Sequence, residues 1–491
     1  MGAERGDRPG AAVVPVVGVA AVVAGVLSVL SGRYGFHRDE LYFMVAGEHP
    51  AWGYVDQPPL TPMAARAAVA VFGSSPAGLR VVATLACAAT VVVAAAVARE
   101  LDGGRRAQVI AAVCTAVSGF VLGVGHMVST ATFDLLLSLV ICLLVLRLLR
   151  TGDGRWWIAV GAAVGLGLEN KDLVALLVVV LLAAVLAVGP RGVLRSRWLL
   201  AGVAIALAVA APNIWWQARH GWPQLTVADG ISADDGTENR LMFVPQQIVY
   251  LSPVFVPIWI AGWRRLWRDP ALRWARAMAV AYPVLAALVL VTGGKGYYAL
   301  PLLIVLMAAG SESVAGWSRR SLAAVIGVTV VVSAAISLPV LPPSALSVVN
   351  AVNQEQGEQI GWPALVAAVA DGWSRIPADE RDRAVIFTQN YGEAGAIARY
   401  GPRHGLPAPY SGHMAFADWG PPPDSADGPV LLVRQDGQDK REDGAFTACR
   451  QVARVDNGQD VDNEEQHATI LLCSGTTAPW SKLWPSLRHS Y

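Results

Sequence analysis

Eleven long apolar stretches dominate the first 344 residues and constrain the fold more than any other feature of the sequence. A helix needs about 20 mostly apolar residues to cross the hydrocarbon core of a bilayer. The stretches lie at residues 11–31, 78–98, 107–125, 130–149, 156–169, 173–188, 198–216, 246–263, 277–292, 299–317 and 321–340. We predict that each is a transmembrane helix, because only helices and closed barrels satisfy backbone polar groups in lipid. The first stretch is longer than a signal-peptide core and is predicted to be retained.

The composition supports a membrane protein with a second, different part. The chain is 54% hydrophobic and 15% charged, whereas soluble domains are about 25% charged. Residues 1–344 carry 26 Lys and Arg against 18 Asp and Glu, and residues 345–491 carry 12 against 19. A net charge of +1 provides no basic surface for phosphate backbones, so no nucleic-acid partner is expected.

The distribution of basic residues predicts the orientation in the membrane. If the N-terminus is cytoplasmic, 18 of the 26 basic residues fall in the inner connections, as the positive-inside rule requires. The long loops 32–77 and 217–245 then lie outside, together with residues 345–491. We therefore expect a multi-pass plasma-membrane (inner, cytoplasmic membrane) protein whose chemistry takes place at the outer face.

The tail at 345–491 has the pattern of a small soluble α/β domain. Residues 384–388, 430–434 and 468–473 are predicted strands, and residues 391–400 a predicted helix. Cys449 and Cys473 lie in this part, outside the membrane, where they either form a disulfide or stay free.

Acidic residues at the outer membrane edge are the first candidates for catalysis. Asp39 and Glu40 follow the first apolar stretch, and a carboxylate there can accept a proton from a hydroxyl group. The structural alternative is a helix cap or an ion pair with Arg38. A candidate substrate loop with paired prolines follows, formed by Asp56, Gln57, Pro58 and Pro59; the alternative is a plain turn.

Further polar residues lie at the outer ends of later helices. Asp134 is about one turn inside its helix, where it either acts in catalysis or complements the helix dipole. His126 precedes it and is either a ligand, a base or a structural residue. Lys171 can hold a phosphate or pair with Glu169 or Asp172. Lys295 can hold a phosphate or extend its side chain to the membrane surface. Lys295 stands in a glycine-rich segment before Tyr297 and Tyr298, which otherwise suit an aromatic belt.

The order of these elements resembles the GT-C membrane glycosyltransferases over roughly residues 30–310. The acidic pair Asp39 and Glu40, followed by the loop 56–60, is the most specific part of the resemblance. The nearest group is glycosyltransferase family 39, with protein O-mannosyltransferases, aminoarabinose transferases and lipopolysaccharide-core sugar transferases. The resemblance implies a GT-C-type α-helical polytopic membrane protein of about 11 transmembrane helices (1–344) with a C-terminal extracytoplasmic α/β domain (345–491).

The resemblance also implies a reaction and roles for residues. In that family a sugar on a polyprenyl phosphate is transferred to an acceptor hydroxyl outside the membrane. Asp39 matches the proposed base and Asp134 the second acidic position, while Lys171 and Lys295 match basic positions near the donor phosphate. A lipid-linked donor needs no nucleotide site, and the sequence contains no Walker loop. The aminoarabinose branch has a lysine where Gln57 stands, so its substrate is not carried over.

Several points stay open at this stage. The sugar is a hexose or a pentose, and the acceptor is a protein, a lipid or a cell-envelope glycan. No cofactor is implied with certainty, although a divalent cation shared by Asp39, Glu40, Asp134 and His126 is one option. Segments 390–394 and 410–413 are similar to tails of some bacterial members, and the tail is expected to lie over the active site and help to select the acceptor. The competing hypotheses are a lipid or sugar transporter without glycosyl transfer and a membrane-anchored binding protein.

Overall fold

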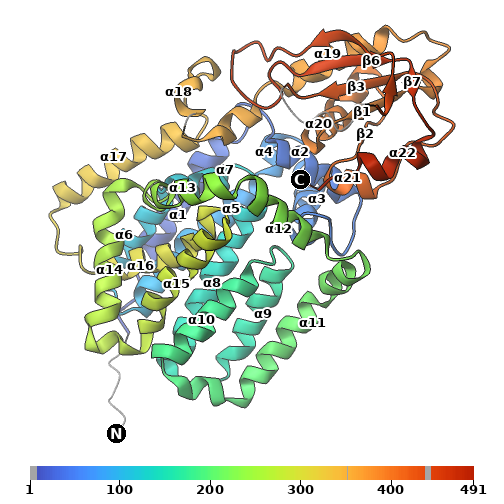
Figure 1. Ribbon diagram of the computed structural model, residues 1–491. Coiled ribbons are helices and arrows are strands. Elements are labelled where there is room, and N and C mark those ends of the chain that lie inside the picture. Colours follow the sequence, from blue (N-terminus) through green and yellow to red (C-terminus); the bar gives the residue numbers. More distant parts are fainter. Residues whose placement is uncertain (1–7, 351, 437–443, 491) are drawn as a thin grey trace.

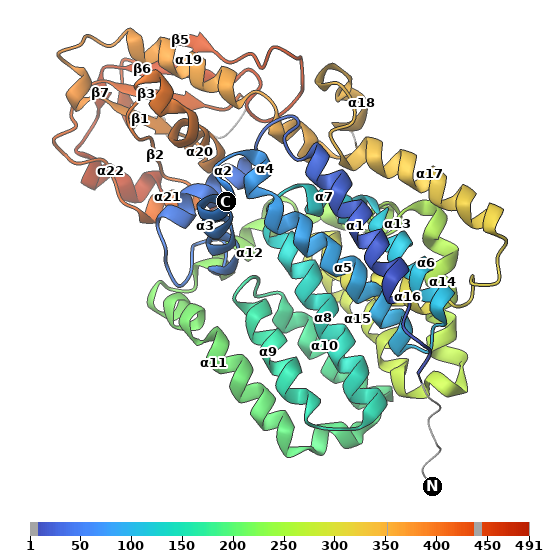
Figure 2. The same ribbon diagram turned by 180° about the vertical axis from the view of Figure 1, so that it is seen from behind.

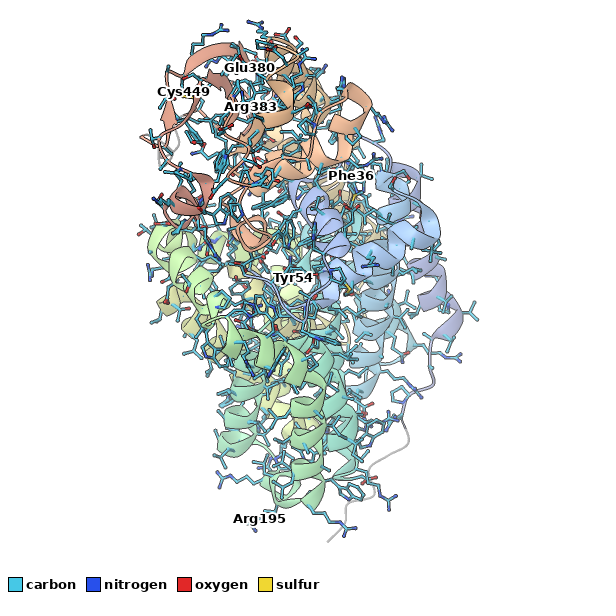
Figure 3. All side chains as sticks on the ribbon, turned by 90° about the vertical axis from the view of Figure 1, so that its right-hand side faces the viewer. Phe36, Tyr54, Arg195, Glu380, Arg383 and Cys449 are labelled. Atoms are coloured by element: carbon cyan, nitrogen blue, oxygen red, sulfur yellow. A yellow bond between two sulfur atoms is a disulfide. The ribbon has the colours of Figure 1, made fainter. Side chains whose placement is uncertain are left out.

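The computed structural model describes residues 8–350, 352–436 and 444–490. Within this part, helices form a bundle from the N-terminus to residue 337, and a small sheet domain follows at the other end of the chain (Figures 1 and 2). The first described residues, which lead into the helix at 13–30, lie at the end of the bundle far from the sheet domain. Figure 3 shows the same arrangement: Arg195 lies at the end of the bundle far from the sheet domain, and Phe36 and Tyr54 lie toward the end that adjoins it.

Six helical stretches of the described chain are long and apolar enough to cross a membrane: 13–30, 76–100, 130–151, 197–219, 270–292 and 319–337. They contain the helices α1 (Val13–Leu30), α4 (Pro76–Leu79), α5 (Val81–Glu100), α8 (Thr130–Thr151), α11 (Arg197–Arg219), α15 (Arg276–Thr292) and α17 (Arg319–Ser337). On α1, Val14 is 83% exposed and Val29 81%. Such apolar exposure along a whole helix suits a lipid-facing surface.

The other predicted stretches are also helical, but they are bent or short. Two pairs bend at a break: α6 (Arg105–Ala116) with α7 (Gly119–His126) by 60°, and α13 (Gly236–Val249) with α14 (Val256–Arg268) by 69°. The second break precedes Pro253, which has no N–H for a helical hydrogen bond. Shorter apolar helices are α3 (Leu60–Phe72), α9 (Trp156–Leu168), α10 (Val174–Val188) and α16 (Leu300–Gly310). All eleven predicted stretches therefore contain helix, whereas the number of membrane crossings stays a prediction.

The centre of the bundle is tightly packed. Every residue of α16 is buried, so this helix is the core around which the others pack. Helices α9 and α11 meet at glycines: a Cβ atom on Gly161 would lie 2.1 Å from the Gly202 carbonyl oxygen. Small residues at such crossings allow the two backbones to approach closely.

Three helices cover the outer end of the bundle within the predicted outer loops. They are α2 (Arg38–Glu48) and α3 in loop 32–77 and α12 (Pro223–Asp234) in loop 217–245. In both ribbon views α2 and α3 lie between the bundle and the sheet domain (Figures 1 and 2). The outer loops therefore form the junction between the two parts.

The C-terminal domain is built on a five-stranded sheet in the order β2-β1-β3-β6-β5. Its strands are β1 (Val385–Thr388), β2 (Tyr410–Ser411), β3 (Val430–Arg434), β5 (Arg450–Arg454) and β6 (Thr469–Cys473), and a separate ribbon pairs β4 (Phe446–Thr447) with β7 (Gly475–Thr476). Strand β1 runs parallel to β2 and β3, and β6 runs antiparallel to β3 and β5. The helices of this part are α18 (Ser347–Asn350), α19 (Trp362–Ser374), α20 (Tyr391–Tyr400), α21 (Met414–Asp418) and α22 (Trp480–Leu487).

The predicted elements of the tail are confirmed, and four of its strands, β2, β4, β5 and β7, were not predicted. Strands β1, β3 and β6 and helix α20 lie where the sequence places them. Cys449 and Cys473 form a disulfide, one of the two alternatives left open. Strand β5 lies at an edge of the sheet, and most of its side chains are exposed, so its sequence lacks the buried pattern on which the prediction depends.

Candidate functional site

Helix α2 begins with a capping box that fixes the segment around Asp39. The His37 side chain accepts a hydrogen bond from the Asp39 N–H, and the Glu40 carboxylate accepts one from the His37 N–H at 2.8 Å. The reciprocal pair satisfies N–H groups that the first helical turn would leave without partners. The cap alternative considered from sequence is therefore present, and its carboxylate is that of Glu40 rather than Asp39.

Glu40 is the centre of a fully buried ion pair. Its carboxylate lies 2.7 and 2.9 Å from two guanidinium nitrogens of Arg80, and neither side chain has exposed surface. It also accepts a hydrogen bond from the Val128 N–H at 3.0 Å. This arrangement ties α2 to α5 and to the start of α8, and it favours a structural role for Glu40 over the catalytic role that the sequence suggests.

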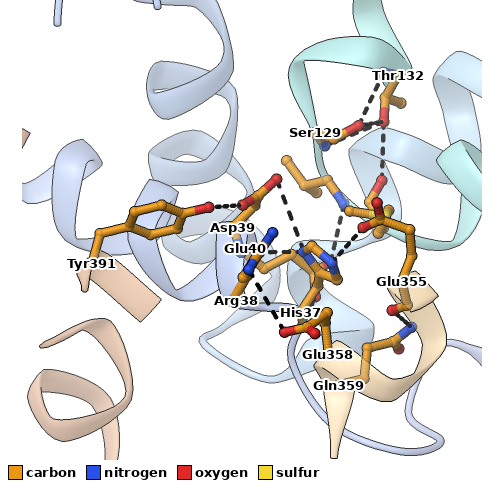
Figure 4. A network of polar contacts seen from close by, with 12 residues as sticks. His37, Arg38, Asp39, Glu40, Ser129, Thr132, Glu355, Glu358, Gln359 and Tyr391 are labelled. Atoms are coloured by element: carbon orange, nitrogen blue, oxygen red, sulfur yellow. Dashed lines mark hydrogen bonds and ion pairs between the residues drawn. The ribbon is translucent and has the colours of Figure 1, made fainter. Parts of the chain in front are cut away.

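Asp39 points the other way and keeps 31% of its side chain exposed. One carboxylate oxygen accepts a hydrogen bond from the Tyr391 hydroxyl at 2.8 Å, and the other lies 4.0 Å from His37 Nδ1 (Figure 4). Tyr391 belongs to the C-terminal domain. Asp39 is thus a solvent-accessible carboxylate held in one orientation, which is the geometry that proton transfer requires.

The proline loop lies beside Asp39. Asp56 accepts a hydrogen bond of 2.6 Å from the Tyr42 hydroxyl. Burial raises the pKa of Asp56 to about 6, with a further rise from the charge of Asp39 and an opposing effect of the Tyr42 hydrogen bond. Gln57 is 2% exposed, and neither polar atom of its amide has a hydrogen-bond partner within the described part of the chain. Pro58 and Pro59 lead into α3, with Pro59 at its N-cap.

A second group brings Asp134, Lys171 and the two tyrosines together. Asp134, in the first turns of α8, is 7% exposed, and the charge of Lys171 acts on it. The Lys171 ammonium donates a hydrogen bond to the Tyr297 hydroxyl at 3.2 Å and lies 4.8 Å from the ring centroids of Tyr297 and Tyr298. Cation–π contacts of this kind hold an ammonium without neutralising its charge. Lys171 is therefore held by the two tyrosines beside the start of α8.

Asn170 positions that lysine. The Asn170 amide accepts a hydrogen bond from Thr61 Oγ1 at 2.8 Å and donates one to the Thr130 carbonyl at 2.9 Å. It therefore joins α3, which follows the proline loop, to the N-terminus of α8. The two groups of candidate residues share this rigid support.

Glu355 lies against His37, and the charge of Lys295 acts on its carboxylate. It lies in the 3-10 turn η6 (Gln354–Gln359), and its carboxylate is 2.8 Å from His37 Nε2. The surrounding protein raises the pKa of Glu355, but the His37 hydrogen bond and the charges of His37, Arg38 and Lys295 outweigh this effect and lower it to about 2. The side chain is nevertheless 60% exposed, so the carboxylate is accessible to solvent.

His126 does not fit the shared cation considered from sequence. Its Nε2 atom lies 3.3 Å from the Arg80 guanidinium, and the side chain is 2% exposed. A positive group at that distance opposes a second cation. Among the described residues, no three side chains of His, Cys, Asp or Glu are grouped so that they could hold a metal ion.

Comparisons with known proteins define the class of the fold. A family model described as dolichyl-phosphate-mannose-protein mannosyltransferase matches residues 56–216, a segment that includes Asp56, Asp134 and Lys171. The structure of ArnT from Cupriavidus metallidurans bound to undecaprenyl phosphate is similar, with a TM-score of 0.63 and 16% identity over 94% of this chain and 97% of that one. Its apo form gives 0.62 at 14% identity, with the same coverage. A search of curated protein sequences finds no match.

The arabinofuranosyltransferase AftD from Mycobacteria is also similar, with a TM-score of 0.50 and 14% identity over 94% of this chain and 40% of that one. At these identities the structural likeness establishes the fold. The protein is a multi-pass membrane protein with the GT-C glycosyltransferase fold and a C-terminal sheet domain. The resemblance stated from the sequence is thereby confirmed.

The structure adds residues that the sequence did not single out. Tyr391 and Glu355 come from the last 150 residues and reach the segment around Asp39. Arg80 stands before an ordinary apolar helix and carries no local pattern that marks it as buried. The unexplained segment 390–394 was the one signal that could have pointed to Tyr391.

Proposed function

We propose that this protein transfers a hexose or pentose from a polyprenyl-phosphate-linked donor to an acceptor hydroxyl at the outer face of the membrane. The proposal is carried by the accessible carboxylate of Asp39 in a GT-C fold that also contains Lys171, whose charge acts on Asp134, and Lys295, whose charge acts on Glu355. The bound undecaprenyl phosphate of ArnT from Cupriavidus metallidurans supports a donor of the same chemical class.

The chemistry of the step explains the residue types. The acceptor oxygen forms a bond to the sugar C1 atom while the bond from C1 to the donor phosphate oxygen breaks. Asp39 accepts the hydroxyl proton as general base. The leaving polyprenyl phosphate keeps the electron pair and gains one negative charge, which Lys171 and Lys295 stabilise.

The other predicted residues support these groups. Asp134 lies within the field of Lys171 and fixes the lysine near the phosphate position. Tyr297 and Tyr298 hold its ammonium, and Asp56, Gln57, Pro58 and Pro59 border the acceptor side of Asp39. The N-terminus is cytoplasmic and the C-terminal domain extracytoplasmic, in agreement with the basic inner connections.

A transfer assay tests the proposal. Purified protein in vesicles is given a panel of polyprenyl-phosphate hexoses and pentoses together with envelope lipids and glycans as acceptors. We expect one donor to be consumed, with formation of free polyprenyl phosphate and a glycosylated acceptor in equal amounts. Movement of a donor across the vesicle membrane without cleavage of any donor would favour the transporter hypothesis instead.

A further inference from the structure

The C-terminal domain contacts His37, Arg38 and Asp39, the three residues at the start of α2. The Glu355 carboxylate lies 2.8 Å from His37, the Glu464 carboxylate lies 2.5 Å from the Arg38 guanidinium, and the Tyr391 hydroxyl lies 2.8 Å from Asp39. These partners come from three separate segments of the domain, and Figure 4 shows Tyr391 and Glu355 approaching from different sides. The C-terminal domain therefore forms part of the candidate site.

Helix α20 presents Tyr391 to Asp39 in a fixed position. Tyr391 is the first residue of this helix, whose N-cap Asn390 accepts a hydrogen bond from the Glu393 N–H at 2.9 Å. A Cβ atom on Gly395 would lie 2.9 Å from Leu41 Cβ and 3.0 Å from the Leu41 carbonyl carbon. Only glycine fits this contact without a shift, so α20 lies directly on the backbone of α2.

The tyrosine ring is held as firmly as its hydroxyl. Its centroid lies 5.0 Å from that of Tyr42 and 5.1 Å from that of His413, within the range of favourable aromatic pairs. The Tyr42 hydroxyl is already bound to Asp56. The two tyrosines thus approach the two neighbouring carboxylates separately, one hydroxyl for each.

We infer that Tyr391 is a positioning residue for glycosyl transfer: its hydroxyl occupies one oxygen of Asp39 and directs the other toward the acceptor hydroxyl. The inference rests on the proposed role of Asp39 as base. Docking of the C-terminal domain is then a condition for full activity.

The test compares Tyr391→Phe with Tyr400→Phe in the full-length protein. Tyr400 ends the same helix, and its hydroxyl has no hydrogen-bond partner within the described chain. With the donor and acceptor that the wild type uses, we expect Tyr391→Phe to lower kcat roughly 10- to 100-fold with donor KM unchanged. Tyr400→Phe changes neither quantity.

The comparison of kcat needs the other charged groups near Asp39 to stay as they are. Those that act on Asp39 from the surrounding elements are His37, Arg38, Asp56 and Tyr391 itself. Only Tyr391 is altered, and the phenylalanine ring fills the same space. Equal thermal unfolding of the variant and wild type checks that the fold is kept.

Two results would overturn the inference. One is a wild-type kcat for Tyr391→Phe, and the other is a change confined to acceptor KM, which would make Tyr391 an acceptor contact. Asp39→Asn is measured in the same series. If Asp39→Asn abolishes transfer while Tyr391→Phe transfers at the wild-type rate, the positioning role fails and the proposed function stands. If Asp39→Asn leaves transfer intact, the proposed function itself fails.

Discussion

Replacement of Glu40 by glutamine separates a structural from a catalytic role for the acidic pair. The change removes the charge that balances Arg80, which has no exposed surface. Within the described chain its remaining partners are neutral: the Ser31 and Gly35 carbonyls, the Gln359 amide and the His126 imidazole. Breaking a buried pair by removing one partner costs about 3–5 kcal/mol. At about 2 °C per kcal/mol for a chain of this size, the unfolding midpoint falls by roughly 5–10 °C.

The assay is thermal unfolding of the purified protein in detergent, followed by intrinsic tryptophan fluorescence. Asp371→Asn is the matched control, because it breaks a half-exposed ion pair of 2.6 Å with Arg375. Exposed pairs contribute about 0–1 kcal/mol, so the control midpoint should change by at most about 2 °C. Equal midpoints for the two variants would refute the structural account of Glu40.

Two further predictions concern the donor side and the acceptor side of the site. Lys171→Met removes a charge held at the outer end of the bundle and should lower kcat by about 100-fold or more, whereas Lys482→Met in the exposed part of the tail should have no effect; equal rates would contradict the phosphate role. The raised pKa of Asp56, about 6, makes the folded state bind its proton more tightly than the unfolded chain does. Its contribution to stability is therefore complete below about pH 4 and is lost as pH rises to about 6. Asp56→Asn should flatten the change in unfolding midpoint across this window relative to wild type, and an unchanged slope would contradict the pKa.

The helices of the bundle could be predicted from the sequence, because an apolar segment in lipid must satisfy its own backbone hydrogen bonds and therefore forms a helix. Every predicted apolar stretch contains helix, and α8 and α10 begin and end within two residues of the stretches predicted for them. What hydropathy cannot give is the path of a helix once it has formed. The bends after α6 and α13 and the short α9 and α10 depend on packing against neighbours, so the number of crossings does not follow from the runs alone.

The candidate site was predictable only as far as its residues carry local patterns. Asp39, Asp134 and Lys171 stand out because ionisable groups are costly at a membrane edge. Tyr391 and Glu355 belong to an ordinary soluble pattern, and their contacts with Asp39 and His37 span 352 and 318 residues. Such contacts arise from the docking of one folded part on another, which no local window of sequence contains.

The most direct test of the central claim is the rate of sugar transfer by Asp39→Asn. Asparagine has nearly the shape of aspartate and still accepts the Tyr391 hydrogen bond at its amide oxygen, so the variant removes the base while the fold is kept. With the donor that the wild type consumes, and with Asp371→Asn as control, we predict a fall in kcat of about 10²–10⁴-fold at an unchanged unfolding midpoint. Transfer at the wild-type rate by Asp39→Asn would contradict the account.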